Sequence, residues 1–423
     1  MPDPSADHTH LHTLPNGVRV LHIHQPQAAG ASVSVFVRSG SQHESARMNG
    51  ISHVIEHMAF KGTLSRSCQQ INLDAERLGA EVNAHTDRDH TAYQLRGLAE
   101  HTLPFVRMLA DIVLNPVFPD GELERERQVI LHELTDLEDD AYDVAYRLFD
   151  DACYGKHAFA RPVIGSRRNI ERFDRSALIA HVGARYTGAN LIVGVAGPAD
   201  PQAVIDVVAA TFGQLPAGTP NLVEAPLWHG GIRIRRHSGS SQSQVVLGWP
   251  VAPMAAQDAT AQVAAAVFGE GMSSPLLDQI RERLGLAYHV SASADQLELG
   301  GQFVIEAATA PAQLDDFLQH TLQLLRQQAE RVDPVDLERA RNQLTVRQLH
   351  ALERPMRRLE DAALDLFVLG RVRSQAELRE RIAAVEAGAV RESFATMLSQ
   401  PAALAVTGKA PAGLRERCEA LFR

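Results

Sequence analysis

Hydrophobic and polar residues alternate along two early stretches of the chain, and a third stretch is almost entirely apolar. The first, VRVLHIH at residues 18–24, follows a Pro-Asn-Gly turn, and the second, ASVSVFV, covers residues 31–37. Side chains on a strand point alternately to opposite faces, so both stretches are predicted to be β-strands. The apolar stretch, LIVGVAG at residues 191–197, predicts a strand that is buried in a sheet.

In two other segments the apolar residues recur at helical spacing. One begins near Asn49, and the other, ELERERQVILHELTDL, covers residues 122–137. In the second segment we expect Leu123, Val129, Ile130 and Leu134 on the apolar side of an amphipathic helix.

The pattern of the first half begins again after a Pro/Gly-rich passage near residues 215–231, which indicates a linker. Three fragments recur in the same order, 206 to 214 residues later: ERLGAEVNA at 76 as ERLGLAYHV at 282, LERERQ at 123 as LERARN at 337, and LIVGVAG at 191 as AALAVTG at 402. This internal repeat predicts an α+β protein of two homologous α/β-sandwich domains, each a mixed, mostly antiparallel sheet packed with helices. We place the domains at residues 10–216 and 232–423, with the linker at 217–231.

Composition narrows the class of protein. The chain has 423 residues, a net charge of -10 and no basic run, which argues against a nucleic-acid partner. Three widely spaced cysteines indicate neither a disulfide framework nor an all-cysteine zinc site. The start of the sequence, MPDPSADHTHLHTL, does not resemble a signal peptide, and no apolar run is long enough to span a membrane. We therefore expect a cytoplasmic protein without a membrane partner.

The segment HVIEH is the strongest candidate for chemistry. On a helix, His53 and His57 lie four residues apart on one face and could bind one ion, with Glu56 close by. The alternative is a solvated helix face in a chain with 19 histidines. A catalytic zinc takes three protein ligands, so the zinc interpretation requires another ligand elsewhere. Nothing in the sequence makes His85 or His90 that ligand.

With its surroundings, this motif resembles that of the pitrilysin/insulinase family of zinc metallopeptidases. GISHVIEHMAFKGT, VNAHTDRDHTAY, LNPVFP and RERLGLAY all resemble family signatures, in the family's order. In that family a glutamate about 76 residues after the second histidine is the third ligand, and another glutamate seven residues earlier supports the site. The resemblance therefore implies Glu133 as a ligand and Glu126 as the supporting residue. The second half of the chain has Arg347 and Ala340 at these positions, so the metal site belongs to the first half.

The resemblance also implies roles for other residues. Zinc, one per chain, would acidify water, and Glu56 would take the proton and pass it to the leaving amine. Asn83 and Ala84 would lie on a strand edge that pairs with the substrate backbone. From the second half, Arg281 and Tyr288 would bind the substrate, with the tyrosine hydroxyl at its carbonyl. Judged from the residues alone, Tyr288 could equally be a core aromatic.

In length and domain number the chain resembles the short branch of the family, which includes mitochondrial processing peptidase subunits and bacterial processing peptidases. That branch implies a zinc metalloendopeptidase that hydrolyses short unfolded peptides or presequences in a closed chamber formed by two chains. The alternative is a non-catalytic or half-active subunit of a heterodimeric peptidase. The sequence leaves open whether the partner is an identical or a related chain, and which peptides are cut.

Overall fold

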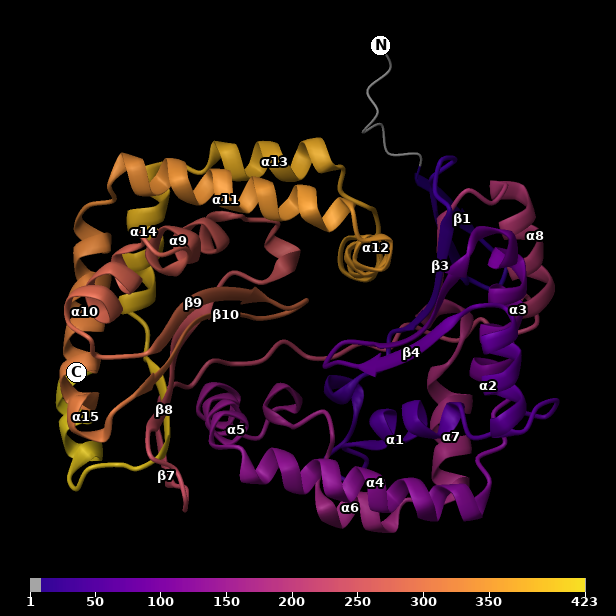
Figure 1. The fold of residues 1–423 in the computed structure, drawn as a ribbon, viewed down its shortest axis with the longest axis horizontal. Helices are drawn as coiled ribbons and strands as arrows, with labels where there is room; N and C mark the ends of the chain where they lie inside the picture. Colours follow the sequence, from indigo (N-terminus) through magenta and orange to yellow (C-terminus); the bar gives the residue numbers. More distant parts are fainter. Residues whose placement is uncertain (1–8, 423) are drawn as a thin grey trace. The chain divides into compact units, whose positions relative to one another are not determined.

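The computed structural model describes residues 9–422, and the chain forms two compact units (Figure 1). Among the described residues, the first unit consists of residues 9–134, 161–223 and 350–374, and the second of residues 135–160, 224–349 and 375–422. Residues 1–8, on which part of the signal-peptide prediction rests, and residue 423, the end of the predicted second domain, lie outside the described residues. No described helix is long and apolar enough to cross a membrane.

The first unit is built on a mixed six-stranded sheet. Its strand order is β1-β2-β6-β3-β5-β4, in which β2 and β6 are parallel and all other neighbours are antiparallel. β4 is an edge strand, and β5 is its only partner among the described strands. The bounds are β1 Thr9–Thr13, β2 Arg19–His24, β3 Gly30–Val37, β4 Glu81–Thr86, β5 Thr91–Leu98 and β6 Leu191–Gly197, which confirms the predicted strands.

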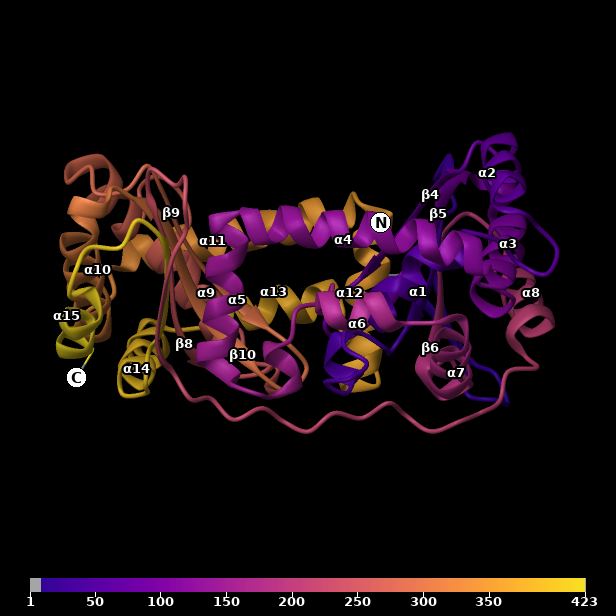
Figure 2. The same cartoon turned by 90° about the horizontal axis from the view of Figure 1, so that it is seen from below.

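Helices cover one face of this sheet and build the main core of the unit. Val33, Val35 and Val37 point into this core, as their alternation predicts. The helices α3 and α8 run side by side there (Figure 1, Figure 2). Apart from α5, which packs on the second sheet, the α-helices of the first half of the sequence are α1 Ile51–Ala59, α2 Cys68–Arg77, α3 Thr102–Leu114, α4 Asp120–Asp139, α6 Arg167–Arg172, α7 Arg175–Arg185 and α8 Pro201–Phe212.

The opposite face of the sheet is covered by α12, Pro355–Leu369, which comes from the second half of the sequence (Figure 1). Leu359 and Leu366 of α12 share a second apolar cluster with Phe36 and Ile192 of the sheet. Gly194 leaves room for the helix, because a β-carbon there would lie 3.2 Å from Cδ2 of Leu359. Residues 31–37 of β3 are therefore buried on both faces, serines included.

The second unit repeats the sheet of the first with one strand fewer. Its order is β7-β11-β8-β10-β9, with β7 and β11 parallel and the other neighbours antiparallel. This matches β2-β6-β3-β5-β4 strand for strand and confirms the duplication. The strands are β7 Gly231–Arg236, β8 Ser243–Val251, β9 His289–Gln296, β10 Gly301–Thr309 and β11 Ala403–Gly408.

Helices from both halves of the sequence also pack on the second sheet. α5, Ala141–Tyr154, comes from the first half and contacts β7, β8 and β11. Its Phe149 lies against Gly248, where a β-carbon would come within 2.7 Å of the ring. The remaining helices are α9 Thr260–Gly269, α10 Leu314–Glu330, α11 Pro334–Leu352, α13 Gln375–Ala384, α14 Ala387–Leu398 and α15 Leu414–Leu421.

The predicted linker corresponds to an irregular segment, since residues 216–230 contain neither helix nor strand. The predicted domains, 10–216 and 232–423, follow the repeat in the sequence. The compact units differ from them because α5 belongs to the second unit and α12 to the first. The repeat is therefore visible in the sequence, whereas this exchange of helices is not.

Packing of α12 gives a stability prediction. Leu359→Ala should lower the free energy of unfolding of the first unit by about 2–5 kcal/mol, because Leu359 is fully buried and truncation leaves a cavity. Scanning calorimetry and hydrogen exchange in β3 and β6 would measure the loss. Leu64→Ala, at a side chain that is 79% exposed, is the control and should change stability by less than about 0.5 kcal/mol. Equal effects of the two substitutions would contradict the packing argument.

Candidate metal centre

The start of α1 is fixed by a glycine and a buried carboxylate. Gly50 precedes the helix with φ +99°, and a β-carbon there would lie 2.7 Å from the carbonyl oxygen of Ile164. The carboxylate of Glu44 accepts hydrogen bonds from the backbone N–H groups of Gly50 and Ser52, both at 2.8 Å. These groups belong to the unsatisfied amino end of the helix, which a negative charge stabilises. Burial raises the pKa of Glu44, and these hydrogen bonds oppose the rise.

The long helix α4 supplies the glutamates. Its buried positions are Leu123, Glu126, Ile130 and Leu134, which form one helical stripe. The prediction that Val129 also lies on this stripe was wrong, since its side chain is 43% exposed. Each residue of a helix turns the side chain by about 100°, so Val129 lies beside the buried stripe rather than on it.

The structure brings the three predicted ligands together. Oε2 of Glu133 lies 3.9 Å from Nε2 of His53 and 3.6 Å from Nε2 of His57. One ligand atom from each residue lies within 4.8 Å of the others. Burial lowers the pKa of His53 to about 3, so its imidazole is neutral at pH 7, as a metal ligand must be. The donor set and its spacing fit a catalytic zinc with three protein ligands.

Glu126 supports one of these ligands. Its Oε2 accepts a hydrogen bond of 3.1 Å from Nδ1–H of His57, and its Oε1 lies 2.6 Å from Nζ of Lys61. A carboxylate on Nδ1 fixes the tautomer of the ring and leaves the lone pair of Nε2 toward the metal position. This is the geometry expected of a residue that orients a ligand.

Glu56 lies beside the ligands, and a residue of the sheet holds its carboxylate in place. Its Oε2 accepts a hydrogen bond of 2.7 Å from the hydroxyl of Thr86 at the end of β4. Burial raises the pKa of Glu56, and the Thr86 hydroxyl opposes the rise. Glu56 is not part of the ligand group that the described residues form. It is therefore a carboxylate with a raised pKa next to the metal position, suited to taking up a proton.

Asn83 and Ala84 lie on the edge strand β4. Ala84 is half-buried and packs against the main core, and Asn83 is exposed. Because side chains alternate along a strand, Ala84 shares a face with Thr86, and Asn83 shares the opposite face with His85. The outer edge of β4 pairs with no described strand, so its backbone groups can accept an added strand.

The two predicted residues of the second unit lie next to each other. Arg281 lies in the helical segment η6, Leu277–Arg283, and Tyr288 directly precedes β9. The guanidinium carbon of Arg281 lies 5.8 Å from the ring centroid of Tyr288. Tyr288 is 82% exposed, so the alternative of a core aromatic was wrong and its hydroxyl is accessible.

Three neighbours of the centre were not predicted: Glu44, Lys61 and Thr86. Thr86 lies two residues after Ala84 on β4, so strand spacing carried a signal for it, whereas Lys61 lies in the turn after α1, beyond the reach of helical spacing. No such spacing links Glu44 to the helix that it caps. In the second unit Arg347, at the position of Glu133, forms an ion pair with Glu270. The described residues form groups able to hold a metal in the first unit only.

Comparison with known proteins agrees with this architecture. Residues 19–167 match the family Insulinase (Peptidase family M16), and residues 172–344 match the Peptidase M16 inactive domain. A crystal structure described as a peptidase M16 inactive domain from Pseudomonas fluorescens superimposes with a TM-score of 0.88, covering 96% of this chain and 99% of that one at 18% identity. At this identity the likeness shows the fold alone.

Several relatives carry the name uncharacterized zinc protease, among them proteins from Rickettsia bellii and Mycobacterium leprae. The protein from Rickettsia bellii is 29% identical over 397 residues, which is 93% of this chain and 96% of the relative. The protein from Mycobacterium leprae is 32% identical over 313 residues, 73% of this chain and 70% of the relative. Together with the matches to both family domains, these similarities show that the chain belongs to the insulinase family of peptidases, peptidase family M16.

Proposed function

We propose that this chain is a zinc-dependent metalloendopeptidase that hydrolyses short unfolded peptides. One observation carries the proposal: Nε2 of His53, Nε2 of His57 and Oε2 of Glu133 surround one point, beside the separately held carboxylate of Glu56. This is the donor set of a catalytic zinc together with a base. The names of the relatives support the same class of reaction.

Each residue of the centre then has a separate task. Bound zinc would supply a Lewis acid that acidifies water and polarises the peptide carbonyl. Glu56 accepts a proton at its carboxylate and delivers it to the nitrogen of the leaving amine. Thr86 holds Oε2 of Glu56 in place, and Glu126 holds the ring of His57 in the required tautomer.

The edge of β4 supports an extended peptide as the substrate. A segment that adds to a sheet edge must offer its own backbone N–H and C=O groups, and these are engaged in the interior of a folded domain. The exposed hydroxyl of Tyr288 can donate to a carbonyl oxygen as it gains negative charge. Unfolded peptides therefore fit this centre better than folded proteins do.

The other candidate is a non-catalytic or half-active subunit that needs a partner chain. The complete ligand set and the base Glu56, which Thr86 holds in place, favour the catalytic interpretation, because a non-catalytic subunit has no need of them. Digestion of a mixed-length peptide library by the purified chain, with and without a zinc chelator, separates the two. Chelator-sensitive cleavage by the chain alone supports the proposal, and zinc binding without cleavage supports the alternative.

Zinc content tests the ligand assignment. His57→Ala and Glu133→Ala should each cost the chain one equivalent of zinc, because two remaining ligands hold the ion poorly. Elemental analysis after dialysis measures the content. Glu124→Gln, at an exposed glutamate on the same helix, serves as the control and should keep all of the zinc. Full zinc content in both ligand variants would exclude these residues as ligands.

A substitution at Glu56 separates binding from chemistry. Glu56→Gln keeps the size of the side chain but cannot accept a proton, so peptide cleavage should fall about 10²-fold or more. The zinc content should stay that of the unsubstituted chain. Initial rates on a quenched fluorescent peptide give the first result and elemental analysis the second. Cleavage at the original rate would show that Glu56 is not the base.

Tyr288→Phe tests the contribution of the second unit. Loss of a donor to the developing oxyanion should lower kcat/KM about 10²–10³-fold, while zinc content and melting temperature stay the same because the side chain is exposed. Tyr142→Phe, at a less exposed tyrosine that bonds to Glu306 in the same unit, is the matched control and should retain activity. A rate for Tyr288→Phe within about threefold of the original, under 1 kcal/mol, would refute the assigned role.

A further inference from the structure

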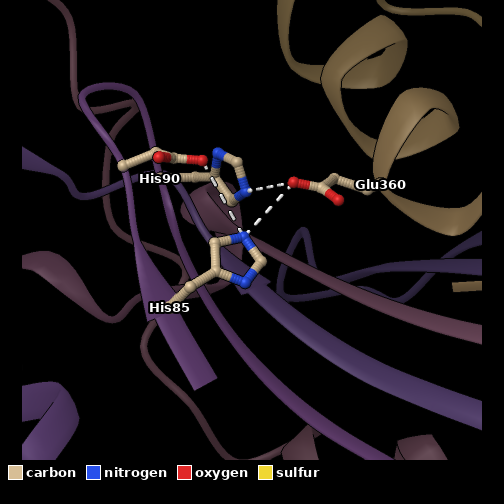
Figure 3. A group of neighbouring side chains, drawn as sticks. His85, His90 and Glu360 are labelled. Carbon is tan, nitrogen blue, oxygen red and sulfur yellow. Dashed lines mark ion pairs between the residues drawn. The ribbon is translucent and has the colours of Figure 1, made fainter. Parts of the chain in front are cut away.

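A second group of potential ligands lies in the first unit, formed by His85, Asp87 and His90 of the β4–β5 hairpin and by Glu360 of α12. We propose that these four residues form a second divalent-metal site, of the zinc type, that fastens α12 to the hairpin. Figure 3 shows the imidazoles of His85 and His90 and the carboxylate of Glu360 directed toward one another. The proposal does not depend on the peptidase activity proposed above.

The spacing of the donor atoms fits one small ion. Nε2 of His85 lies 3.2 Å from Oε1 of Glu360 and 3.9 Å from Oδ2 of Asp87, and Nε2 of His90 lies 3.8 Å from the same Glu360 oxygen. Four ligands held tetrahedrally at zinc distances of about 2.0–2.2 Å are separated from one another by about 3.3–3.6 Å. The observed separations lie close to this range, and all four atoms are within 4.8 Å of one another.

The burial and the hydrogen bonding of His90 favour its role as a metal ligand. Its side chain is 2% exposed, and its Nδ1–H donates a hydrogen bond of 2.8 Å to Oδ1 of Asp89. In the neutral ring, the form that binds a metal, that bond places the proton on Nδ1 and leaves a lone pair on Nε2, which faces Glu360. This Nε2 atom is buried and has no hydrogen-bond partner. A buried polar atom without a partner is costly, and a metal ion in the group would satisfy it.

The Nε2 atom of His85 also lacks a hydrogen-bond partner, but it lies closer to Glu360 than Nε2 of His90 does. This atom is buried and has no hydrogen-bond partner, although Oε1 of Glu360 lies only 3.2 Å away. The distance is short enough for a hydrogen bond, so the direction of the ring N–H is what fails. A direct hydrogen bond would need that alignment, whereas an ion between the two residues needs only that both lone pairs point at it. The misaligned contact therefore favours a shared ion over a direct histidine–glutamate hydrogen bond.

The two metal centres lie on opposite faces of the sheet. Thr86 points toward α1 and bonds to Glu56, so its neighbour His85 points to the other face, where α12 lies. A centre with four protein ligands leaves no open position and is structural rather than catalytic. Its effect is mechanical, because it ties the strand that positions the base to a helix from the other half of the sequence.

Metal stoichiometry tests the second centre in a chain that lacks the first. The full-length double variant His57→Ala/Glu133→Ala, dialysed against zinc chloride, should retain about one zinc per chain by elemental analysis. Adding Glu360→Gln to this background should remove it. Glu353→Gln is the matched control, because Glu353 lies 3.5 Å from His350 but belongs to no ligand group among the described residues. An empty double variant, or equal zinc with and without Glu360→Gln, would overturn the proposal.

Thermal stability gives a readout that does not depend on counting ions. Zinc at about 100 times its dissociation constant should raise the melting temperature of the double variant by about 5–10 °C, since binding to the folded state alone stabilises it. The rise should be absent with Glu360→Gln and preserved with Glu353→Gln. If Glu360→Gln unfolds the zinc-free protein, the same measurement is made with His85→Gln, a substitution at a half-buried residue of the hairpin. A rise that persists in either ligand variant, or no rise in the double variant, would contradict the second centre.

Discussion

Burial of the first sheet on both faces is the constraint on which the rest of the molecule depends. One face packs against helices that are near it in the sequence, and the other is closed only when α12 arrives from beyond residue 350. Apolar strands such as β6 lose stability if either face meets water, and this burial holds β3 and β5, the strand with which β4 pairs, in register. The carboxylate of Glu56 is held through β4, so the geometry of the metal centre depends on packing at the far side of the sheet.

After the duplication, the two similar units differ in the residues available for metal binding. Both units keep the same strand order, yet only the first combines a histidine helix with the buried glutamate of α4. At the position of Glu133 the second unit has Arg347, whose charge pairs with Glu270 and would repel a metal ion. A fold that is stabilised mainly by its sheet and core tolerates such exchanges, because α4 and α11 present these residues away from the apolar clusters.

Spacing within one helix or strand was enough to predict part of this structure. The i, i+4 pair His53 and His57 and the alternation in β3 are local patterns, and the family motif added Glu133, which local spacing cannot reach. The prediction that Val129 lies on the buried face of α4 was wrong, because the sequence alone does not distinguish an apolar residue beside a buried stripe from one within it. Tyr288 could not be assigned to core or surface from its neighbours alone. The approach of Glu360 to His85 was beyond sequence reasoning, because it results from a long-range exchange of helices that leaves no periodic signal.

The exchange of α5 and α12 means that the halves of the gene do not encode independent proteins. The polypeptide passes between the units five times, after residues 134, 160, 223, 349 and 374. A chain translated only as far as the segment at 216–230 would have made the first sheet without the helix that closes it, and would carry α5 without its receiving sheet. During synthesis one apolar face of the first sheet therefore stays exposed until α12, in the last quarter of the chain, has been made. In that period chaperones or a complementary fragment could bind to this face. Two separately translated halves, in contrast, would each carry the helix that the other lacks, so gene fission would yield obligate partners rather than two free domains.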